Sequence, residues 1–450
     1  MRRLRSLIRI NPPKSAVAAL PQDTEVTFAP MEALSDGLGG LDGASRRLLS
    51  DVASGSYSYF AEGDILLAKV TPCFENGKKA IARGLANGIG FATSEVHVIR
   101  PDTRHVDTSY LRYLFCSEQF RAAGIASMTG AGGLRRVSEE AVLNFRVPIA
   151  DIVLQRRIAD FLDRETARID QLIESKERQN AALEEGHQAF VSQAVTHGLT
   201  KTMMKPSGLP WVPELPAHWN VTRLKFLCAR IVDCLHETPE HSDNGDFPSI
   251  RTADVGRGIL LLDQAKRVSE DEYRHRIQRL EPNENDVLYT REGERFGLAT
   301  LVPPGVKLCL GQRMMMFRAN GRVVPAFLMW SLNGEFAYQW LKQSTAGATS
   351  PHLNIFDIRN VPIFLPPIPE QNAIATTIFR RFERKEAARK AVTLSIDRLR
   401  EYRAALITAA VTGQIDVITS RKRSDTDRQL NAIDTQIAAA AQPERREKRA

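Results

Sequence analysis

The stretch Val361-Pro362-Ile363-Phe364-Leu365-Pro366-Pro367-Ile368-Pro369-Glu370-Gln371 joins a short apolar strand to a long helical segment. It has a counterpart in the first half of the chain, where Val147-Pro148-Ile149 is followed by Gln155. From Gln155 and Gln371 onward the match keeps a constant offset, through Ala194-Val195-Thr196 and Ala410-Val411-Thr412. A period of more than ~200 residues indicates a duplicated domain, because solenoid repeats are much shorter. The chain therefore reads as two copies of one plan.

The earlier part of each half matches more loosely. Gly63-Asp64-Ile65-Leu66 resembles Asn285-Asp286-Val287-Leu288, and Arg3-Leu4 resembles Arg223-Leu224. Alternating and β-branched residues predict strands, and short amphipathic stretches predict helices. The predicted strands are residues 64–70, 95–99 and 285–290, and the predicted helices are residues 110–120 and 326–340. Each half thus begins with a globular part that mixes helices and strands.

A long helical segment follows each globular part. Apolar residues recur every seven positions, which is the pattern of two helices packed along their length. The series are Leu162, Ile169, Leu183 and Phe190 in the first segment, and Ile378, Val392, Leu399 and Leu406 in the second. Each segment is about 40 residues, or roughly 60 Å of helix, and Gly198 and Gly413 stand where a helix stop is expected. We expect the two segments to pair antiparallel; ordinary bundle helices are the alternative.

These patterns predict an α+β fold. It contains two similar globular α/β-mixed domains separated by two long helices, which pack as an antiparallel coiled coil with pseudo-two-fold internal symmetry. Four prolines predict an extended, irregular linker between the halves. The predicted parts are a globular domain at 1–150, a helical spacer at 151–199, the linker at 200–218, a second globular domain at 219–366, a second spacer at 367–417 and a charged flexible tail at 418–450.

Composition sets limits on the class of protein. The 450 residues carry a formal charge of +8, which is only a weak hint of a polyanionic partner when spread over the whole chain. Five cysteines are few and odd in number, which favours a reducing cytoplasm. No apolar run reaches the roughly 18 residues of a membrane span, and the basic start lacks the apolar core of a signal peptide.

Several stretches of the sequence resemble enzyme motifs, but each lacks a residue that the motif requires. Gly77-Lys78 continues with Lys79, so it is not a phosphate loop. The glycines at 37–42 and 130–135 lack the third glycine of a dinucleotide fingerprint. Asn11-Pro12-Pro13 ends in Lys14, where an adenine methyltransferase needs an aromatic ring to stack on the base. We therefore predict a non-catalytic chain with no catalytic residues and no cofactor.

One cluster contains residue types that suit zinc: Cys228, Cys234, His236 and His241. Its spacing differs from that of zinc fingers and ribbons, so we favour a buried cysteine followed by a polar loop and predict no metal site.

Polar loops near predicted strand ends remain in both halves. Arg, Asn, Gln and Glu read base edges, and Lys and Thr contact phosphates. The candidate DNA-binding residues are Lys69, Thr71, Asn76, Lys78, Lys79, Arg135 and Arg136 in the first half, and Arg291, Glu292, Arg295, Gln312, Arg313 and His352 in the second. Each loop alone is typical of a solvated surface; their recurrence at comparable points in both halves favours binding.

The chain resembles the DNA specificity subunits of type I restriction-modification systems. The segment Phe60–Lys78 looks like one type of target recognition domain, and Val361–Gln371 looks like the junction into the conserved helix of this family. The first junction, Ile149–Gln155, keeps the Gln but lacks the Pro-Pro and the Glu. His218-Trp219 leads into the second half, while only Met1-Arg2 precedes Arg3, so we expect a late start or a tolerated trimming.

The resemblance implies that each recognition domain reads one half of a split double-stranded DNA site through the major groove. The helices would hold the two domains apart and set the spacing of the half-sites. Two modification subunits, which methylate adenine, and two restriction-translocase subunits would be the protein partners, with no membrane involved. The rival interpretations are a single-chain methyltransferase or nuclease, and a coiled-coil scaffold with no role on DNA.

Overall fold

The computed structural model describes residues 1–35, 40–131, 133–293, 295–343 and 353–417, together with positions 432 and 435. The chain divides into two compact units. The first contains residues 1–177 and the chain from 391 onward, and the second contains residues 178–390. Apart from positions 432 and 435, the predicted tail at 418–450 lies outside the described residues.

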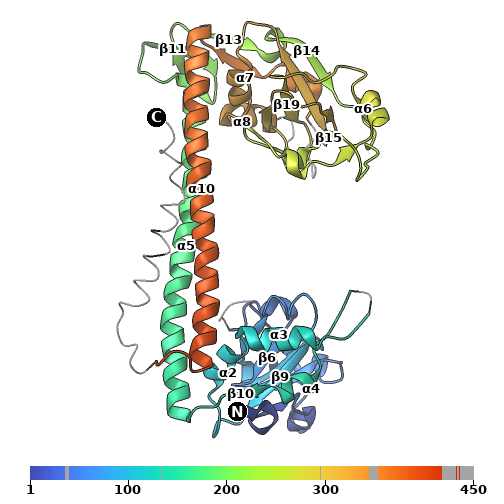
Figure 1. Ribbon diagram of the computed structural model, residues 1–450, viewed down its shortest axis with the longest axis vertical. Helices are drawn as coiled ribbons and strands as arrows, with labels where there is room; N and C mark the ends of the chain where they lie inside the picture. Colours follow the sequence, from blue (N-terminus) through green and yellow to red (C-terminus); the bar gives the residue numbers. More distant parts are fainter. Residues whose placement is uncertain are drawn as a thin grey trace, which may run out of the picture. The chain divides into compact units, whose positions relative to one another are not determined.

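A four-stranded antiparallel sheet is the centre of the first unit (Figure 1). Its strand order is β2-β9-β6-β7, with β2 at Ile8–Ile10, β9 at Val96–Pro101, β6 at Ile65–Ala68 and β7 at Lys79–Ile81. Side chains alternate between the two faces of a strand, so Ile65 and Leu67 pack toward the helices while Leu66 packs on the opposite face. The helices are α2 (Thr108–Leu114), α3 (Glu118–Ala126) and α4 (Glu139–Asn144).

The same arrangement is repeated in the second unit. The sheet order is β14-β22-β19-β20, with β14 at Cys228–Asp233, β22 at Met314–Ala319, β19 at Val287–Thr290 and β20 at Ala299–Leu301. The helices are α7 (Pro325–Leu332), α8 (Glu335–Gln343) and α9 (Ile355–Arg359). Because strand order, strand direction and helix order all agree, the predicted duplication is confirmed at the level of topology.

A smaller sheet accompanies each main sheet. In the first unit it is β4-β3-β8-β5, at Ser45–Leu48, Glu25–Ala29, Ile89–Ala92 and Ser58–Ala61. In the second it is β18-β15-β21, at Arg267–Val268, Phe247–Ile250 and Cys309–Leu310. Each contains one parallel pair, β3 with β8 and β15 with β21. Other short elements include α1 (Leu49–Val52), α6 (Glu270–Arg276) and the hairpin of β16 (Val255–Gly256) and β17 (Ile259–Leu260).

An ion pair is duplicated along with the sheet. The Arg100 guanidinium on β9 donates to both carboxylate oxygens of Asp64, at 2.8 and 2.6 Å. Arg318 on β22 donates to Asp286 in the same way, at 2.9 and 2.7 Å. Both aspartates are buried, and such two-pronged pairs fix geometry more firmly than single contacts do. The pair raises the pKa of each arginine.

The first strand of each globular domain pairs with the last. β1 (Arg2–Arg3) is antiparallel to β10 (Arg146–Val147), and β13 (Asn220–Arg223) is antiparallel to β23 (Pro362–Leu365). The chain therefore enters and leaves each domain at neighbouring points.

The two long helices are α5 (Ile152–His197, 46 residues) and α10 (Ile368–Val411, 44 residues). In the first unit Leu162 and Ile169 of α5 lie in one core with Leu399 and Leu406 of α10. In the second unit Val191, Ala194 and Val195 of α5 lie in one core with Ile374 and Ile378 of α10. The start of each helix therefore packs with the end of the other, which confirms the antiparallel pairing (Figure 1).

Gln155 and Gln371 explain why the junction motif recurs. The Gln155 amide donates to the carbonyls of His105 and Ala150 and accepts from the Asp107 N–H. Gln371 donates to the carbonyls of Arg322 and Pro366 and accepts from the Val324 N–H. Both side chains are buried, so each ties the start of a long helix to the loop before α2 or α7.

Three local predictions are wrong. The helix predicted at residues 110–120 is split into α2 and α3, because the Ser117 hydroxyl accepts from the Phe120 N–H and starts a new helix. The helix predicted at residues 326–340 breaks likewise, between α7 and α8 at Asn333 and Gly334. The linker predicted to be irregular contains a β-hairpin, β11 (Met204–Leu209) with β12 (Val212–Pro216).

In the part of the chain that the structure describes, no helix combines the length and the apolar character that a membrane span needs.

Candidate nucleic-acid interface

Three loops of the second domain meet at one edge of the main sheet. The strand register pairs Thr290 with Met314 and Met315 with Asp233. The residues that follow β19, precede β22 and follow β14 must therefore lie together. This brings Arg291 and Glu292 next to Gln312 and Arg313, as the sequence-based selection of those residues requires.

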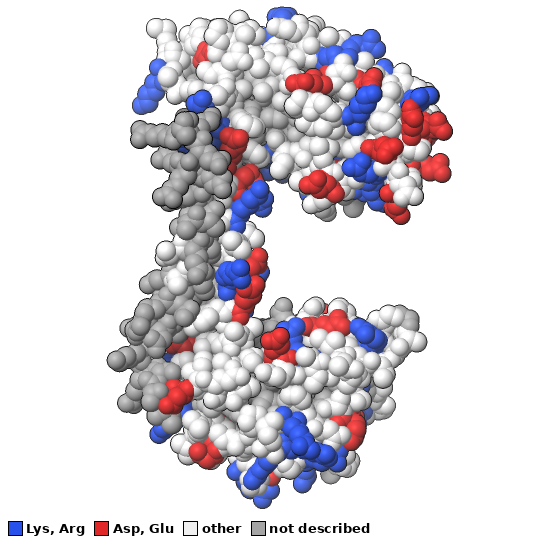
Figure 2. All heavy atoms as spheres, in the orientation of Figure 1, with Lys and Arg blue, Asp and Glu red and all other residues white. Residues whose placement is uncertain are grey.

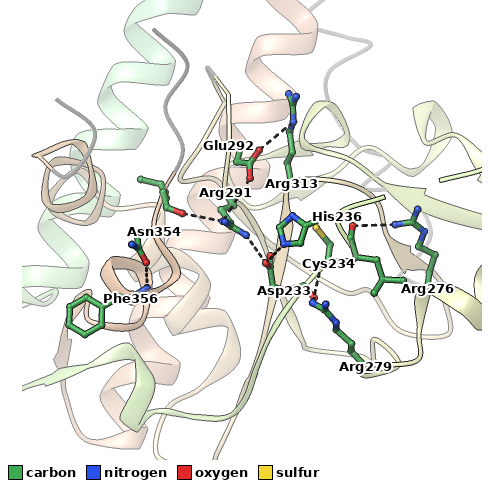
Figure 3. A network of polar contacts seen from close by, with 12 residues as sticks. Asp233, Cys234, His236, Arg276, Arg279, Arg291, Glu292, Arg313, Asn354 and Phe356 are labelled. Atoms are coloured by element: carbon green, nitrogen blue, oxygen red, sulfur yellow. Dashed lines mark hydrogen bonds and ion pairs between the residues drawn. The ribbon is translucent and has the colours of Figure 1, made fainter. Parts of the chain in front are cut away.

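Arg291 is the centre of this edge (Figure 3). Its side chain is only 7% exposed, and its guanidinium donates to the Asp233 carboxylate at 2.6 Å and to the Leu353 carbonyl at 3.1 Å. His236 makes a 2.9 Å hydrogen bond to the same carboxylate oxygen. Arg279 donates to the backbone carbonyls of Asp233 and Cys234, which fixes the same loop. Arg291 therefore holds three chain segments together from within.

Gln312 and Arg313 lie on the outer side of this network. The Arg313 side chain is 59% exposed, and its Nε is 3.5 Å from Glu292 Oε2. Its backbone has a φ of +65°, a left-handed conformation that turns the chain sharply just before β22. The Gln312 amide donates to the Thr238 hydroxyl at 2.9 Å. This edge thus presents an exposed guanidinium beside a half-buried carboxylate and a half-buried amide.

The other two predicted residues of this half are not brought to that group. Arg295 donates to the Val255 carbonyl at 2.7 Å, in the β16–β17 region. His352 lies outside the described residues.

The corresponding edge of the first domain is built by Thr71. Its hydroxyl donates to the Gly133 carbonyl and accepts from the Arg135 N–H, at 3.1 and 3.0 Å, while its own N–H donates to the Arg135 carbonyl. A bridge between Val70 and Arg136 continues this pairing. Thr71 is buried, so its role in the structure is to attach the loop at 129–137 to the end of β6.

Arg135 and Arg136 project from that loop with carboxylate partners. Arg136, whose side chain is 45% exposed, donates to both oxygens of Glu95 at 2.8 and 2.9 Å. Its hydrogen bond holds the pKa of the Glu95 carboxyl below its usual value. Arg135 lies 3.3 Å from Glu75. The guanidinium planes are therefore oriented before any ligand binds.

The lysines of the first half differ in exposure. Lys69 and Lys78 are half-buried, and Asn76 is exposed at the tip of its loop. Lys79 is only 3% exposed and donates to the Gly77 carbonyl at 2.8 Å, so it supports the turn that carries Asn76 and Lys78.

Comparison with known proteins shows which proteins this chain is similar to. The family model for the type I restriction modification DNA specificity domain matches residues 216–393. The type I restriction enzyme EcoEI specificity subunit of Escherichia coli is 25% identical over 459 residues, covering 83% of this chain and 76% of that protein. Over most of its length the chain is therefore similar to type I restriction enzyme specificity subunits.

A further relative and a solved structure show the same similarity. The EcoAI specificity subunit of Escherichia coli is 36% identical over 188 residues, which cover 42% of this chain and 31% of that protein. A solved structure titled for complex assembly and conformational transition of the type I R-M system has the same fold, with a TM-score of 0.69 and 17% identity over 92% of this chain and 97% of that one.

Two acidic residues at these sheet edges, Glu95 and Asp233, were not among the residues predicted from the sequence. Glu95 directly precedes β9, as Arg313 directly precedes β22, and Asp233 ends β14. Both were detectable in principle, because they flank strands at the repeated edge. The prediction by residue type included one carboxylate, Glu292, which pairs with Arg313, but it overlooked Glu95 and Asp233.

The weak zinc candidate gains no support from geometry. Among the described residues, no three His, Cys, Asp or Glu side chains group as metal ligands. His236 bonds to Asp233, and burial raises the pKa of the Cys228 thiol to about 12 and also raises that of Cys234.

Proposed function

We propose that this chain is the non-catalytic subunit that reads a bipartite DNA sequence for a type I restriction-modification complex. The recognition domains would be residues 1–150 and 219–366, and the helical spacers 151–199 and 367–417. The observation that carries the proposal is the duplicated sheet edge. In both domains it presents exposed guanidiniums beside carboxylates, on a scaffold shared with specificity subunits.

We assign two roles to the predicted residues. The exposed side chains of Arg136, Asn76 and Arg313, together with half-buried Gln312, would contact DNA, because amide and guanidinium groups match the donors and acceptors on base edges. Buried Arg291 and Lys79, whose polar atoms are engaged inside the protein, would hold the reading loops in place. The ion pairs of Arg136 and Arg313 are partly exposed, so a base or a phosphate can compete for them at modest cost.

We further propose that modification subunits, and through them restriction subunits, assemble on the long helices. Exposed apolar side chains on these helices support this, because a partner that covers them would remove apolar surface from water. Val153 is 55% exposed on α5, and Leu394 and Phe379 are 41% and 49% exposed on α10.

The test begins with methylome sequencing of the host, which gives the methylated split site. Gel-shift titration of the chain together with its modification subunit would then use duplexes with that site, with either half scrambled, or with the spacing changed by one base pair. We expect each scrambled half to weaken binding by the ~4 kcal/mol or more that separates specific from non-specific binding. Methyl transfer by the isolated chain, or equal binding to all duplexes, would refute the proposal.

A further inference from the structure

A hollow of about 620 Å³ lies within the second unit, between the globular domain and the long helices. Arg257, in the turn between β16 and β17, and Arg295 line it from the domain. Lys385 and Arg389 of α10 line it from the helix side, together with the acidic residues Glu386 and Glu184. Figure 2 shows basic and acidic side chains next to each other on the described part of the long helices.

Positive charge is in excess in this hollow. Its two glutamates are already paired, since Lys385 lies 2.6 Å from Glu184 and 3.0 Å from Glu386, and Arg389 lies 3.0 Å from Glu386. Among the described residues, Arg257 and Arg295 have no carboxylate within ion-pair distance. Two guanidiniums on one wall therefore keep their charge uncompensated, and a concave surface concentrates the field that they produce.

Helix packing does not demand these charges. Counted from the matched Gln155 and Gln371, the positions of Lys385 and Arg389 correspond to Ile169 and Ile173 in the first half. Ile169 is fully buried in the core of the first unit. Lys385, only 8% exposed, carries a desolvation cost that an isoleucine avoids. The second half thus replaces a packing pair by a cationic pair that faces the hollow.

We propose that this hollow binds the DNA backbone, through the phosphates on the spacer side of the half-site that the second domain reads. The assignment rests on the proposed function. Arg257 and Arg295 would contact the phosphates by their planar donor groups, which suit phosphate oxygens. Arg389 would join them from α10 and so fix the position of the duplex relative to the helix. Such contacts carry no sequence information but set the register of the reader.

The test compares Arg257→Gln/Arg389→Gln with the matched control Arg274→Gln/Arg398→Gln. The control removes the same charge from exposed arginines that also form short-range ion pairs, with Glu270 and Glu401. Full chain with its modification subunit would be titrated with the split-site duplex between 50 and 200 mM salt. Each lost phosphate contact lowers the slope of log affinity against log salt by ~0.9, so the double variant should lose about 1.8, a difference of about 12-fold over this salt range.

Ethylation interference locates the phosphates. We expect one or two ethylated phosphates on the spacer side of the second half-site to weaken binding by the wild-type protein and by the control, but not by the double variant. Arg257→Lys should keep the slope, because it keeps the charge. Calorimetry with inorganic phosphate distinguishes a site for free anions: loss of phosphate binding in the double variant with an unchanged DNA slope would overturn the assignment.

An unchanged slope in a complex that still reads its split site would overturn this assignment alone. A wild-type complex with no preference for the split site would overturn the proposed function, and the assignment with it.

Discussion

Replacing Gln371 by Met should destabilise the second unit far more than its modest change in shape suggests. The Gln371 amide accepts from the Val324 N–H at 2.7 Å and donates to the carbonyls of Pro366 and Arg322 at 2.9 and 3.3 Å. The side chain is 1% exposed, so water cannot replace these bonds. At roughly 1 kcal/mol for each lost bond, and more for a stranded buried N–H, the free energy of unfolding should fall by about 3 kcal/mol.

The tryptophans allow this effect to be measured separately in the two units. All four, Trp211, Trp219, Trp330 and Trp340, lie in the second unit. Urea unfolding followed by tryptophan fluorescence therefore reports that unit, while far-UV circular dichroism reports both. Gln371→Met should shift the fluorescence transition to lower urea. The matched Gln155→Met removes three equivalent hydrogen bonds in the first unit. It should shift the circular dichroism transition of the first unit and leave the tryptophan fluorescence transition unchanged.

Gln171, which is exposed on α5, is the control, and Gln171→Met should change the free energy of unfolding by less than ~0.5 kcal/mol. A cost below ~1 kcal/mol for Gln371→Met, the size of a single ordinary hydrogen bond, would contradict a stabilising role for all three bonds. An equal shift of the fluorescence transition by Gln155→Met would contradict the assignment of each glutamine to its own unit.

Three further predictions concern pH, DNA reading and loop geometry. His187 packs against Trp330 and Phe382, and burial, aided by the charge of Lys385, lowers its pKa from 6.5 to about 4. Between these pH values the unfolded chain binds a proton that the folded chain does not, so the free energy of unfolding falls as the pH falls. Urea unfolding should show a decrease between pH 8 and pH 5 that is about 2 kcal/mol smaller in His187→Phe than in the wild type. Arg313→Ala should weaken binding and relax base preference at one position of the second half-site by about 1–3 kcal/mol, measured with substituted duplexes, and an unchanged preference would remove Arg313 from the readers. Gly130 has a φ of +148°, and a Cβ there would lie 2.3 Å from the Leu134 carbonyl oxygen. Gly130→Ala should therefore weaken binding of the first half-site about tenfold, or ~1.4 kcal/mol, without changing base preference in the second half-site. Full affinity of this variant would contradict a reading role for the loop.

The duplication was predictable because the residues that build the scaffold are fixed by their chemistry. A buried glutamine with three partners and a buried aspartate with a paired arginine tolerate few replacements, so Gln155, Gln371, Asp64 and Asp286 remain recognisable in both halves. The seven-residue seam was predictable for the same reason, since only apolar side chains fill the space between paired helices.

The details of the interface were less accessible. Arg291 and Lys79 were selected for their residue type, but burial depends on contacts with residues far away in sequence, such as Leu353 for Arg291. Partners such as Glu95 for Arg136 are chosen in space, 41 residues apart. The breaks within the predicted helices depend on a single capping hydroxyl or a glycine, a signal too short for periodicity to detect.

The pairing of the first and last strands of each domain has an evolutionary consequence. β1 with β10, and β13 with β23, hold the two ends of a domain about 5 Å apart. A foreign domain with the same closing strands can be inserted there without moving the start of the helix that follows. Recombination with crossovers in these strands would exchange one half of the recognised sequence and keep the other, so that new specificities arise by shuffling whole segments instead of by accumulating point mutations.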